Sequence, residues 1–363
     1  MCGVAVHIIT LLRHLSKEAF ESHLVLLHDG HVGETARNAG IRPFIVGGDF
    51  PGDLRAVFRL ARYIRRNGID IVHTHTLNGN LYGRLSAMLA RRAVIVTTIH
   101  TYMSDTLADI YENSLRRKLV IWQNRVTDRL ASVLITPSEA LKNKVVSEGI
   151  DPEKIHVVSN GIDIPVIQDS DQEFESVRKE FGISKDSFLL GTVGRMVPVK
   201  NLESLMEIVA QLFRDGLKLN LILIGDGPRR EQLESLANSL GISQHVVFTG
   251  WRNDVLRILN GVDLYVHTSV SESFTYSIVE AMSIAKPVIA FDAGSLSEVI
   301  SNGETGFLVT PRNNAAFKEA IAQMSINPDR AKQLGQAARK HTEDSLSAES
   351  MAEKIMTIYR SLV

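Results

Sequence analysis

Short apolar runs alternate with longer segments of helical periodicity along nearly the whole chain. The runs are rich in Val, Ile and Leu, which is typical of strands buried on both faces. In the first half the predicted strands are His23–Leu27, Pro43–Val46, Ile69–His73, Val94–Ile99, Val133–Thr136 and Ile155–Val158. In the second half they are Phe188–Val193, Leu219–Ile224, Val246–Thr249, Leu264–His267, Val288–Phe291 and Gly306–Val309. This alternation predicts an α/β protein with parallel, doubly wound sheets.

Length and polarity divide the chain into domains. A chain of 363 residues is too long for one ordinary core and suits two domains. The polar stretch 165–180 shows little apolar periodicity at its start and is the predicted linker. We therefore expect a first domain over residues 1–166, a second over 167–345 and a final helix within 346–363.

The chain opens without the strand that a Rossmann-like domain normally begins with. Such a domain starts with a strand, followed by a Gly-rich turn and a helix. Here Cys2-Gly3 stands directly at what reads as the turn and the helix. The first strand of the N-terminal domain is thus predicted to be missing, through a mis-set start codon, a truncation or a genuine loss. The first sheet would then lack a central strand.

Composition limits the binding partners and the cellular compartment that we expect for this protein. The formal net charge of −1 gives no broad electrostatic footprint for nucleic acid. The single cysteine excludes an internal disulfide and fits a reducing compartment. No apolar run approaches the length of a membrane span, so we expect a cytoplasmic protein. The basic, apolar-striped helix predicted at 115–130 could touch the inner face of the membrane or hold an anionic acceptor, or it could be an ordinary solvated surface.

The stretch from Val262 to Val299 carries the first candidate chemistry. It reads as strand, Ser/Glu-rich loop, helix and strand, with Glu272 on the loop and Glu280 two turns into the helix. Carboxylates accept hydrogen bonds from hydroxyl-rich ligands, and a helix N-terminus suits a phosphate. The pattern predicts a pocket for a sugar joined to a phosphate. The alternative is that Glu272 caps the helix and Glu280 is a solvated charge.

A second candidate site follows the strand that ends in Gly191-Thr192-Val193-Gly194. Arg195 and Lys200 lie on the loop between this strand and a helix that begins at Leu202. Two cations near a helix N-terminus suit a diphosphate. A rival design would bind the donor through a metal held by an Asp-x-Asp motif. The one clear match, Asp169-Ser170-Asp171, follows no strand and is interpreted as solvated charge, so no metal or other cofactor is expected.

Three histidines stand at strand ends in the first half. His73, His75 and His100 lie within VHTHT and TTIHTY. A group of histidines can indicate a metal site, but the nearby sequence offers no clear acidic or cysteine ligand. We therefore predict hydrogen-bonded histidines and no metal site.

The segment ESFTYSIVEAMSIAKPVIA resembles the Glu-x7-Glu signature of the retaining, sugar-nucleotide-dependent glycosyltransferases with the GT-B fold. That family includes bacterial mannosyltransferases and the glycosyltransferases of capsule and lipopolysaccharide assembly. The resemblance extends from Gly3 to the last helix. It implies two Rossmann-like domains that face a cleft, with the last helix crossing back to the first domain.

The resemblance also implies an activity. The chain would be a hexosyltransferase that moves a sugar from a nucleotide-sugar donor to an acceptor hydroxyl with retention of configuration, in the synthesis of cell-surface polysaccharide or glycolipid. The acceptor would be a glycan, a lipid-linked molecule or a small molecule. The resemblance implies catalytic roles for His100, Glu272, Arg195 and Lys200. It implies an acceptor side formed by Gly3, His75 and His100.

The donor site implied by the resemblance lies wholly in the second half. Trp251 is expected to stack on a base or to cover the core. The implied donor-binding residues are Gly194, Arg195, Lys200, Trp251, Arg252, Glu272, Ser273, Phe274, Thr275 and Glu280.

Some positions depart from the family pattern. Gly294-Ser295 replaces a common Gly-Gly, and Thr275-Tyr276 replaces a frequent Gly-Leu. Two other functions remain open on sequence alone: a nucleotide-sugar 2-epimerase-like isomerase, or a truncated, non-catalytic nucleotide-sugar binder. A nicotinamide dehydrogenase is disfavoured because no Gly-x-Gly-x-x-Gly follows a strand.

Overall fold

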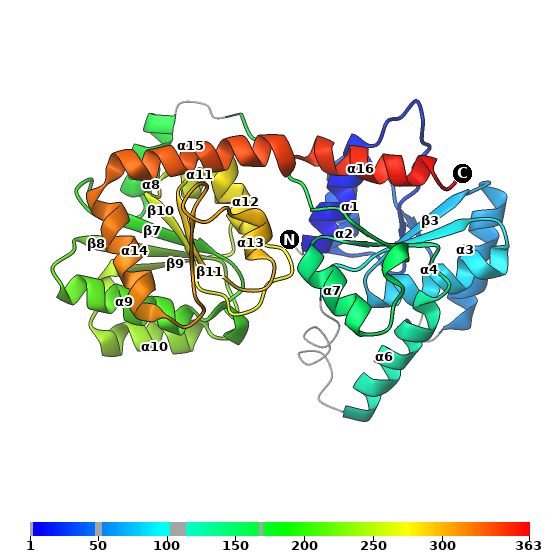
Figure 1. Cartoon of the computed structure of the whole chain (residues 1–363), viewed down its shortest axis with the longest axis horizontal. Coiled ribbons are helices and arrows are strands. Elements are labelled where there is room, and N and C mark those ends of the chain that lie inside the picture. Colours follow the sequence, from blue (N-terminus) through cyan, green and yellow to red (C-terminus); the bar gives the residue numbers. More distant parts are fainter. Residues whose placement is uncertain (1–2, 48–52, 102–113, 167–169) are drawn as a thin grey trace. The chain divides into compact units, whose positions relative to one another are not determined.

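The computed structural model describes residues 3–47, 53–101, 114–166 and 170–363. The chain divides into two compact units, coloured by sequence in Figure 1. The first unit consists of residues 1–163 together with 348–363, and the second consists of residues 164–347. Both the beginning and the end of the chain thus belong to the first unit.

The described strands of the first unit form two parallel sheets. One pairs β1 (Val25–Leu26) with β2 (Phe44–Ile45), and the other has the order β3-β4-β5-β6. Their bounds are Ile71–His75 for β3, Val94–Thr98 for β4, Val133–Thr136 for β5 and Ile155–Val157 for β6. Among the described residues no strand joins β1 to β3. The described strands of this unit therefore form two separate sheets.

Helices connect and cover these strands. They are α1 (Gly3–His14), α2 (His31–Asn38), α3 (Leu54–Arg66), α4 (Leu77–Ala90), α6 (Ser114–Asp128), α7 (Glu139–Ser147), the 3-10 turn η1 (Pro152–Lys154) and α16 (Ala348–Arg360). The last helix completes a core of this unit, in which Met351, Ile355 and Tyr359 pack with Leu11 and Val96. The apolar residues of the last helix therefore pack against the sheet of the first unit.

The second unit contains one six-stranded parallel sheet with the order β12-β11-β10-β7-β8-β9. Its strands are β7 (Phe188–Val193), β8 (Leu219–Ile224), β9 (Val246–Gly250), β10 (Leu264–His267), β11 (Val288–Phe291) and β12 (Phe307–Val309). Strands β7 and β10 are neighbours, and the strand order runs outward from them in opposite directions. In an open parallel sheet, ligands bind at the carboxyl ends of the two strands where the order reverses.

The helices of the second unit follow the predicted alternation with one exception. They are α8 (Ser170–Glu180), η2 (Pro198–Lys200), α9 (Leu202–Arg214), α10 (Arg230–Leu240), η3 (Ser243–His245), α11 (Val255–Asn260), α12 (Tyr276–Ser283), α13 (Leu296–Val299), α14 (Asn314–Ile326) and α15 (Pro328–Ser345). The predicted linker 165–180 is wrong over most of its length, because α8 occupies it from Ser170. In the motif Asp169-Ser170-Asp171, Asp169 and the side chains of the other two residues lie outside the described part.

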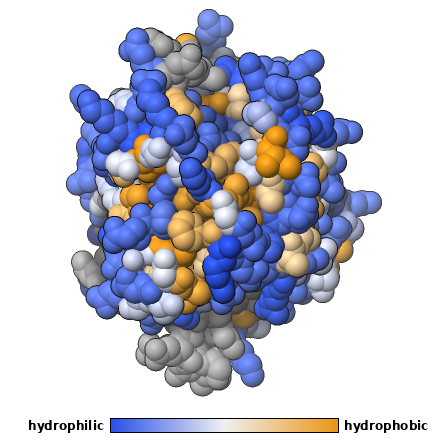
Figure 2. All heavy atoms as spheres, turned by 90° about the vertical axis from the view of Figure 1, so that its left-hand side faces the viewer, coloured by the Kyte–Doolittle hydropathy of each residue, from blue (hydrophilic) through white to orange (hydrophobic). Residues whose placement is uncertain are grey.

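The surface agrees with the mixed composition. Figure 2 shows one face of the molecule, on which hydrophobic residues gather near the middle and hydrophilic residues surround them. In the described part of the chain, no helix combines the length and the apolar character that a membrane crossing requires.

Candidate functional site

A pocket lies where the sheet of the second unit reverses its strand order. It has about 280 Å³ of empty volume. The end of β7 contributes Thr192, Val193, Gly194, Arg195 and Met196, and the end of β10 contributes His267, Thr268 and Ser269. Lys200, Leu202, Leu223 and Ile224 complete the lining. Arg195 and Lys200 therefore line one pocket at the edge where a ligand is expected.

Glycine allows the backbone turns that form this pocket. Gly225 follows β8 with φ of 135°, in a region that favours glycine. A Cβ atom on Gly225 would lie 2.1 Å from the Gly194 carbonyl oxygen. The turn after β8 can therefore press directly on the turn after β7 only because position 225 carries no side chain.

Lys200 and Glu272 meet although 71 residues separate them in the sequence. The Lys200 Nζ lies 2.6 Å from Glu272 Oε1 and donates a hydrogen bond to it. His267 Nε2 lies 3.0 Å from the same oxygen. The predicted cation and the predicted loop carboxylate are thus brought together. Glu272 is not the helix cap of the alternative, because Thr275 is the N-cap residue of α12.

Charge and burial fix the protonation of this trio. Burial acts to raise the pKa of Glu272, but the hydrogen bond from His267 and the charge of Lys200 outweigh it and hold that pKa far below its ordinary value. Burial lowers the pKa of His267, and the neighbouring carboxylate opposes this shift. At neutral pH the trio therefore consists of a carboxylate, an ammonium and a neutral imidazole that donates its Nε2 proton.

Glu280 has a different environment. It lies in the second turn of α12, and burial raises its pKa. Both Glu280 and Glu272 approach the buried Tyr265, whose pKa is raised first by burial and then by these two charges. The charges of the two predicted carboxylates therefore both act on one buried tyrosine of β10, and the half-buried Glu280 is not an ordinary solvated charge.

The loop after Glu272 is held by the segment that follows β11. The Ser295 amide donates to the Glu272 carbonyl oxygen at 3.1 Å, and Ser295 Oγ donates to the Ser273 carbonyl oxygen at 2.7 Å. Phe274 packs edge-on against Tyr276 with 5.2 Å between ring centroids. Thr275 is buried immediately before α12, and its Oγ1 makes no hydrogen bond to a described residue.

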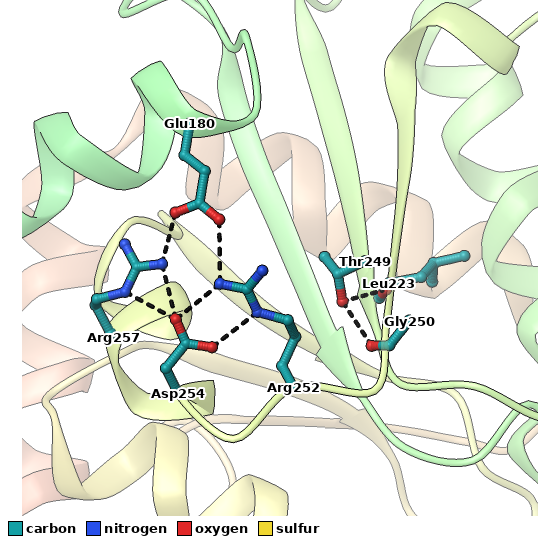
Figure 3. Close-up of polar contacts among 7 residues, drawn as sticks. All are labelled: Glu180, Leu223, Thr249, Gly250, Arg252, Asp254 and Arg257. Carbon is teal, nitrogen blue, oxygen red and sulfur yellow. Dashed lines mark hydrogen bonds and ion pairs between the residues drawn. The ribbon is translucent and has the colours of Figure 1, made fainter.

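Two predicted donor-binding residues follow β9. Trp251 is 63% exposed, so it does not cover the core. Arg252 contacts both Asp254 and Glu180, and Arg257 contacts the same two carboxylates (Figure 3). These ion pairs hold the pKa of Asp254 well below its ordinary range. The Arg252 guanidinium is thus already engaged in a four-residue cluster of charges.

The first unit gathers four histidines at the carboxyl ends of β3 and β4. His75 Nδ1 lies 3.0 Å from His100 Nε2. His73 is bonded on both sides, to Tyr359 Oη at 2.5 Å and to Thr98 Oγ1 at 2.7 Å. His7, from α1, packs edge-on against His100 with 4.8 Å between ring centroids. Gly3 begins the same helix α1.

Burial keeps these histidines neutral. It lowers the pKa of His7 to about 4 and that of His73 to about 3, and it lowers the pKa values of His75 and His100 well below the ordinary value. Neighbouring histidines add to the effect in His73, His75 and His100. Neutral imidazoles can donate, accept or ligate a metal.

Sequence reasoning did not identify three of these residues. His267 reads as the last residue of a strand, Ser295 as part of a turn, and His7 as part of an apolar helix. Ser295 and His7 acquire their places from contacts between segments that are distant in the sequence, whereas His267 contacts Glu272 only five residues further along the chain. For His7 a weak signal existed, because it interrupts an otherwise apolar helix face.

The chain resembles known families over most of its length. Residues 1–165 match the family model described as Glycosyltransferase Family 4, and residues 173–341 match the one described as Glycosyl transferases group 1. EpsD of Bacillus subtilis, named as a glycosyltransferase, is 30% identical over 314 residues, which is 85% of this chain and 81% of EpsD. The Escherichia coli UDP-Gal:alpha-D-GlcNAc-diphosphoundecaprenol alpha-1,3-galactosyltransferase is 25% identical over 276 residues, which is 75% of this chain and 70% of that protein.

Solved structures support the fold. HepE of Anabaena in complex with UDP superposes with a TM-score of 0.86 at 24% identity and covers 99% of this chain and 96% of HepE. The apo lipopolysaccharide outer core galactosyltransferase WaaB gives a TM-score of 0.75 at 17% identity, with 99% of this chain and 96% of WaaB covered. Together with the two family matches, these similarities place the chain in the group 1/family 4 glycosyltransferases, with the GT-B fold of two Rossmann-like domains.

Proposed function

We propose that the chain transfers a hexosyl group from a nucleotide-sugar to an acceptor hydroxyl with retention of configuration, in the synthesis of a cell-surface glycan. The observation that carries this proposal is the meeting of Lys200 with Glu272 at the point of strand-order reversal, with Arg195 in the same pocket. HepE has been solved with UDP and with UDP-glucose, which supports a nucleotide-sugar as the donor here.

The pocket suggests how each donor part is held. Arg195 and Lys200 would bind the diphosphate and neutralise the charge that grows on it as it leaves. Glu272 would accept hydrogen bonds from the sugar hydroxyls, and Glu280 from the ribose hydroxyls. In the structure Glu272 is bonded to Lys200, so the incoming diphosphate has to share or take over that ammonium. Donor binding would thereby free Glu272 oxygen lone pairs for the sugar.

Retention follows from leaving-group assistance in this proposal. The transition state resembles an oxocarbenium ion, and a covalent route would need a carboxylate free to attack the sugar. With the donor bound, Glu272 would still accept hydrogen bonds from His267 and from the sugar hydroxyls, which makes it a poor nucleophile. Attack of the acceptor on the same face that the diphosphate leaves fits these residues better.

The first unit would supply the acceptor site. His100 and His75 lie at the carboxyl ends of its strands, and Gly3 begins the nearby helix. The E. coli relative's name gives a lipid diphosphate-linked sugar as its acceptor, which supports a lipid-linked or glycan acceptor for this chain. We propose no metal requirement, because two cationic side chains already serve the diphosphate.

Helix α6 supports a peripheral contact with the cytoplasmic face of a membrane. Leu119, Trp122 and Val126 form one exposed apolar stripe, and the basic residues Lys118 and Arg125 are also exposed. Such a combination suits an anionic lipid surface. Comparing transfer to a lipid-linked acceptor in anionic and in neutral vesicles tests this contact.

The proposed donor chemistry can be tested with two variants. Lys200→Ala and Glu272→Ala should each lower transfer by about 10²- to 10³-fold, because each removes a charged group that would act on the diphosphate or the sugar. A panel of nucleotide-sugars, screened first by thermal shift on the unmodified chain, identifies the donor for this assay.

Lys218→Ala is the matched control. Lys218 is an exposed lysine immediately before β8, so its loss should leave transfer unchanged. Circular dichroism checks that all three variants fold. Normal turnover by Lys200→Ala or Glu272→Ala would overturn the proposed roles.

A further inference from the structure

In the first unit, three histidine side chains lie close enough together to bind one metal ion. The ligand-capable nitrogens of His7, His75 and His100 all lie within 4.8 Å of one another. The three residues come from different places: α1, the end of β3 and the segment just after β4. Helix and strand therefore fix the three rings independently, as a preformed site requires.

His7 is the residue that points to a ligand. Its side chain is 1% exposed, and neither ring nitrogen makes a hydrogen bond to a described residue. A hydrogen-bonding interaction with the Asn160 side chain partly opposes the fall in the pKa of His7, but it does not reach the geometry of a well-formed hydrogen bond. A buried polar group with no partner costs about 1–3 kcal/mol, so a metal ion bound by His7 would satisfy one of its ring nitrogens.

His73 shows what an ordinary buried histidine looks like in the same unit. Both of its nitrogens are bonded, to Tyr359 and Thr98. His7 has no such arrangement, although it is more deeply buried than His73 and its ring packs against those of His75 and His100. The contrast separates His73, whose two nitrogens are both bonded, from His7.

We infer that His7, His75 and His100 form a three-histidine site for a borderline divalent transition metal, zinc above all. Imidazole nitrogen suits zinc, whereas magnesium and calcium prefer oxygen. Two nitrogens bound to one tetrahedral zinc at about 2.0–2.1 Å lie roughly 3.3 Å apart. The His75 and His100 nitrogens are 3.0 Å apart, so the pair needs only a small opening and the His7 ring a small turn.

An entry path also fits. His75 and His100 are partly exposed, which gives an ion a path to the buried His7. One of the two facing nitrogens of His75 and His100 donates a hydrogen bond to the other, so that ring has to move its proton to its other nitrogen before both can ligate. The expectation of no metal site rested on His73, His75 and His100 alone, and it could not include the contribution of α1.

Visible absorption of cobalt tests this site directly. Chelator-treated full-length protein, titrated with Co²⁺, should develop the d–d bands of a four-coordinate site at one ion per chain, and Zn²⁺ should abolish them. His7→Gln should weaken binding by more than the roughly 10- to 100-fold that loss of an outer-shell partner costs. His156→Gln, at an exposed histidine in β6, should bind as the unmodified chain does.

His100→Gln gives a second test at a half-buried position, should the buried His7 variant fail to fold. The inference is overturned if the unmodified chain binds no metal, or if a folded His7 or His100 variant binds as tightly as the control. Zinc on His100 would also withdraw it from the proposed reaction, so the zinc-loaded enzyme is expected to transfer sugar more slowly than the metal-free one. This second effect rests on the proposed function, whereas the cobalt titration needs neither donor nor acceptor.

Discussion

At the scale of single residues, Glu280 lowers the stability of the second unit near neutral pH. Glu280 is half-buried in α12, and its raised pKa means that the folded state favours the protonated carboxyl. Its contribution to stability is therefore present at low pH and is lost as pH rises through the folded pKa. Near neutral pH a partly desolvated charge remains, which is the usual trade-off between stability and activity at a ligand site.

Replacing that carboxylate should reveal the trade-off. Glu280→Gln is expected to raise the melting temperature near pH 8, by the equivalent of about 1 kcal/mol, and to raise it less near pH 5. The same variant should lose much of the thermal stabilisation by the donor. Glu231→Gln, at an exposed glutamate in α10, serves as the control and should show neither effect. A pH-independent change in Glu280→Gln would contradict the argument.

At the same scale, the sequence predicted some site residues and not others. Lys200 and Glu272 belong to local patterns, a strand end with cations and a carboxylate loop before a helix, and local patterns are legible in one sequence. Ser295 acts on Glu272 through a contact made only after the segment following β11 lies beside the Glu272 loop, and His267 acts on Glu272 through the way the loop after β10 folds back on that strand's end. No local pattern marks them. Arg252 was predicted to bind the donor. Its ion pairs with Glu180 and Asp254 could not be predicted from sequence alone.

At the scale of elements, the loop that bears Glu272 depends on a single glycine. Gly294 has φ of 65°, and a Cβ atom on it would lie 1.8 Å from the Glu272 carbonyl oxygen. Ser295 then bonds the same loop through its amide and its hydroxyl. The segment after β11 thus fixes the position of the loop that carries Glu272.

Gly294→Ala should therefore displace that loop. We expect it to abolish stabilisation by the donor in a thermal shift experiment, because the clash moves Glu272 away from Lys200. Gly303→Ala is the matched control: its φ is 81°, but a Cβ atom there meets nothing within 4 Å. Both variants carry the backbone strain of about 1–2 kcal/mol, and only the first carries the clash. Equal donor binding by the two would contradict the proposed clamp.

Elements were predicted well where they are apolar and poorly where they are polar. The strands of the second unit follow the predicted runs, since each is buried and rich in branched residues. The segment of helix α8 was predicted to be a linker because its sequence is polar, whereas in the structure polar contacts hold much of this helix in place. Arg178 contacts Asp263, and the Glu173 carboxylate accepts a hydrogen bond from Asn260 at 2.6 Å. Only tertiary structure supplies such partners.

At the scale of the whole molecule, the last helix belongs to the unit that the chain begins. Helix α16 buries Met351, Ile355 and Tyr359 among residues of α1, β4 and β5. Its first residue also donates to the Ile162 carbonyl oxygen at 2.8 Å. Losing several large buried side chains, at about 2–5 kcal/mol each, would exhaust the stability of a typical domain.

A chain that ends at Ser347 should therefore lose the first unit and keep the second. Hydrogen exchange read by mass spectrometry should show fast exchange in β3 to β6 and continued protection in β7 to β12. A chain that ends at Arg360 is the control and should be protected throughout. Persistent protection of β4 and β5 without α16 would contradict this expectation.

On the ribosome, this arrangement sets the order of events. The N-terminal unit is synthesised first, yet it must wait for residues 348–363 to leave the exit tunnel before its core can close. The unit made of residues 164–347 is complete before then. We expect the unit made of residues 164–347 to fold first in the nascent chain, and the unit that contains the N-terminus to fold last. The N-terminal segment is then exposed to chaperones for the longest time.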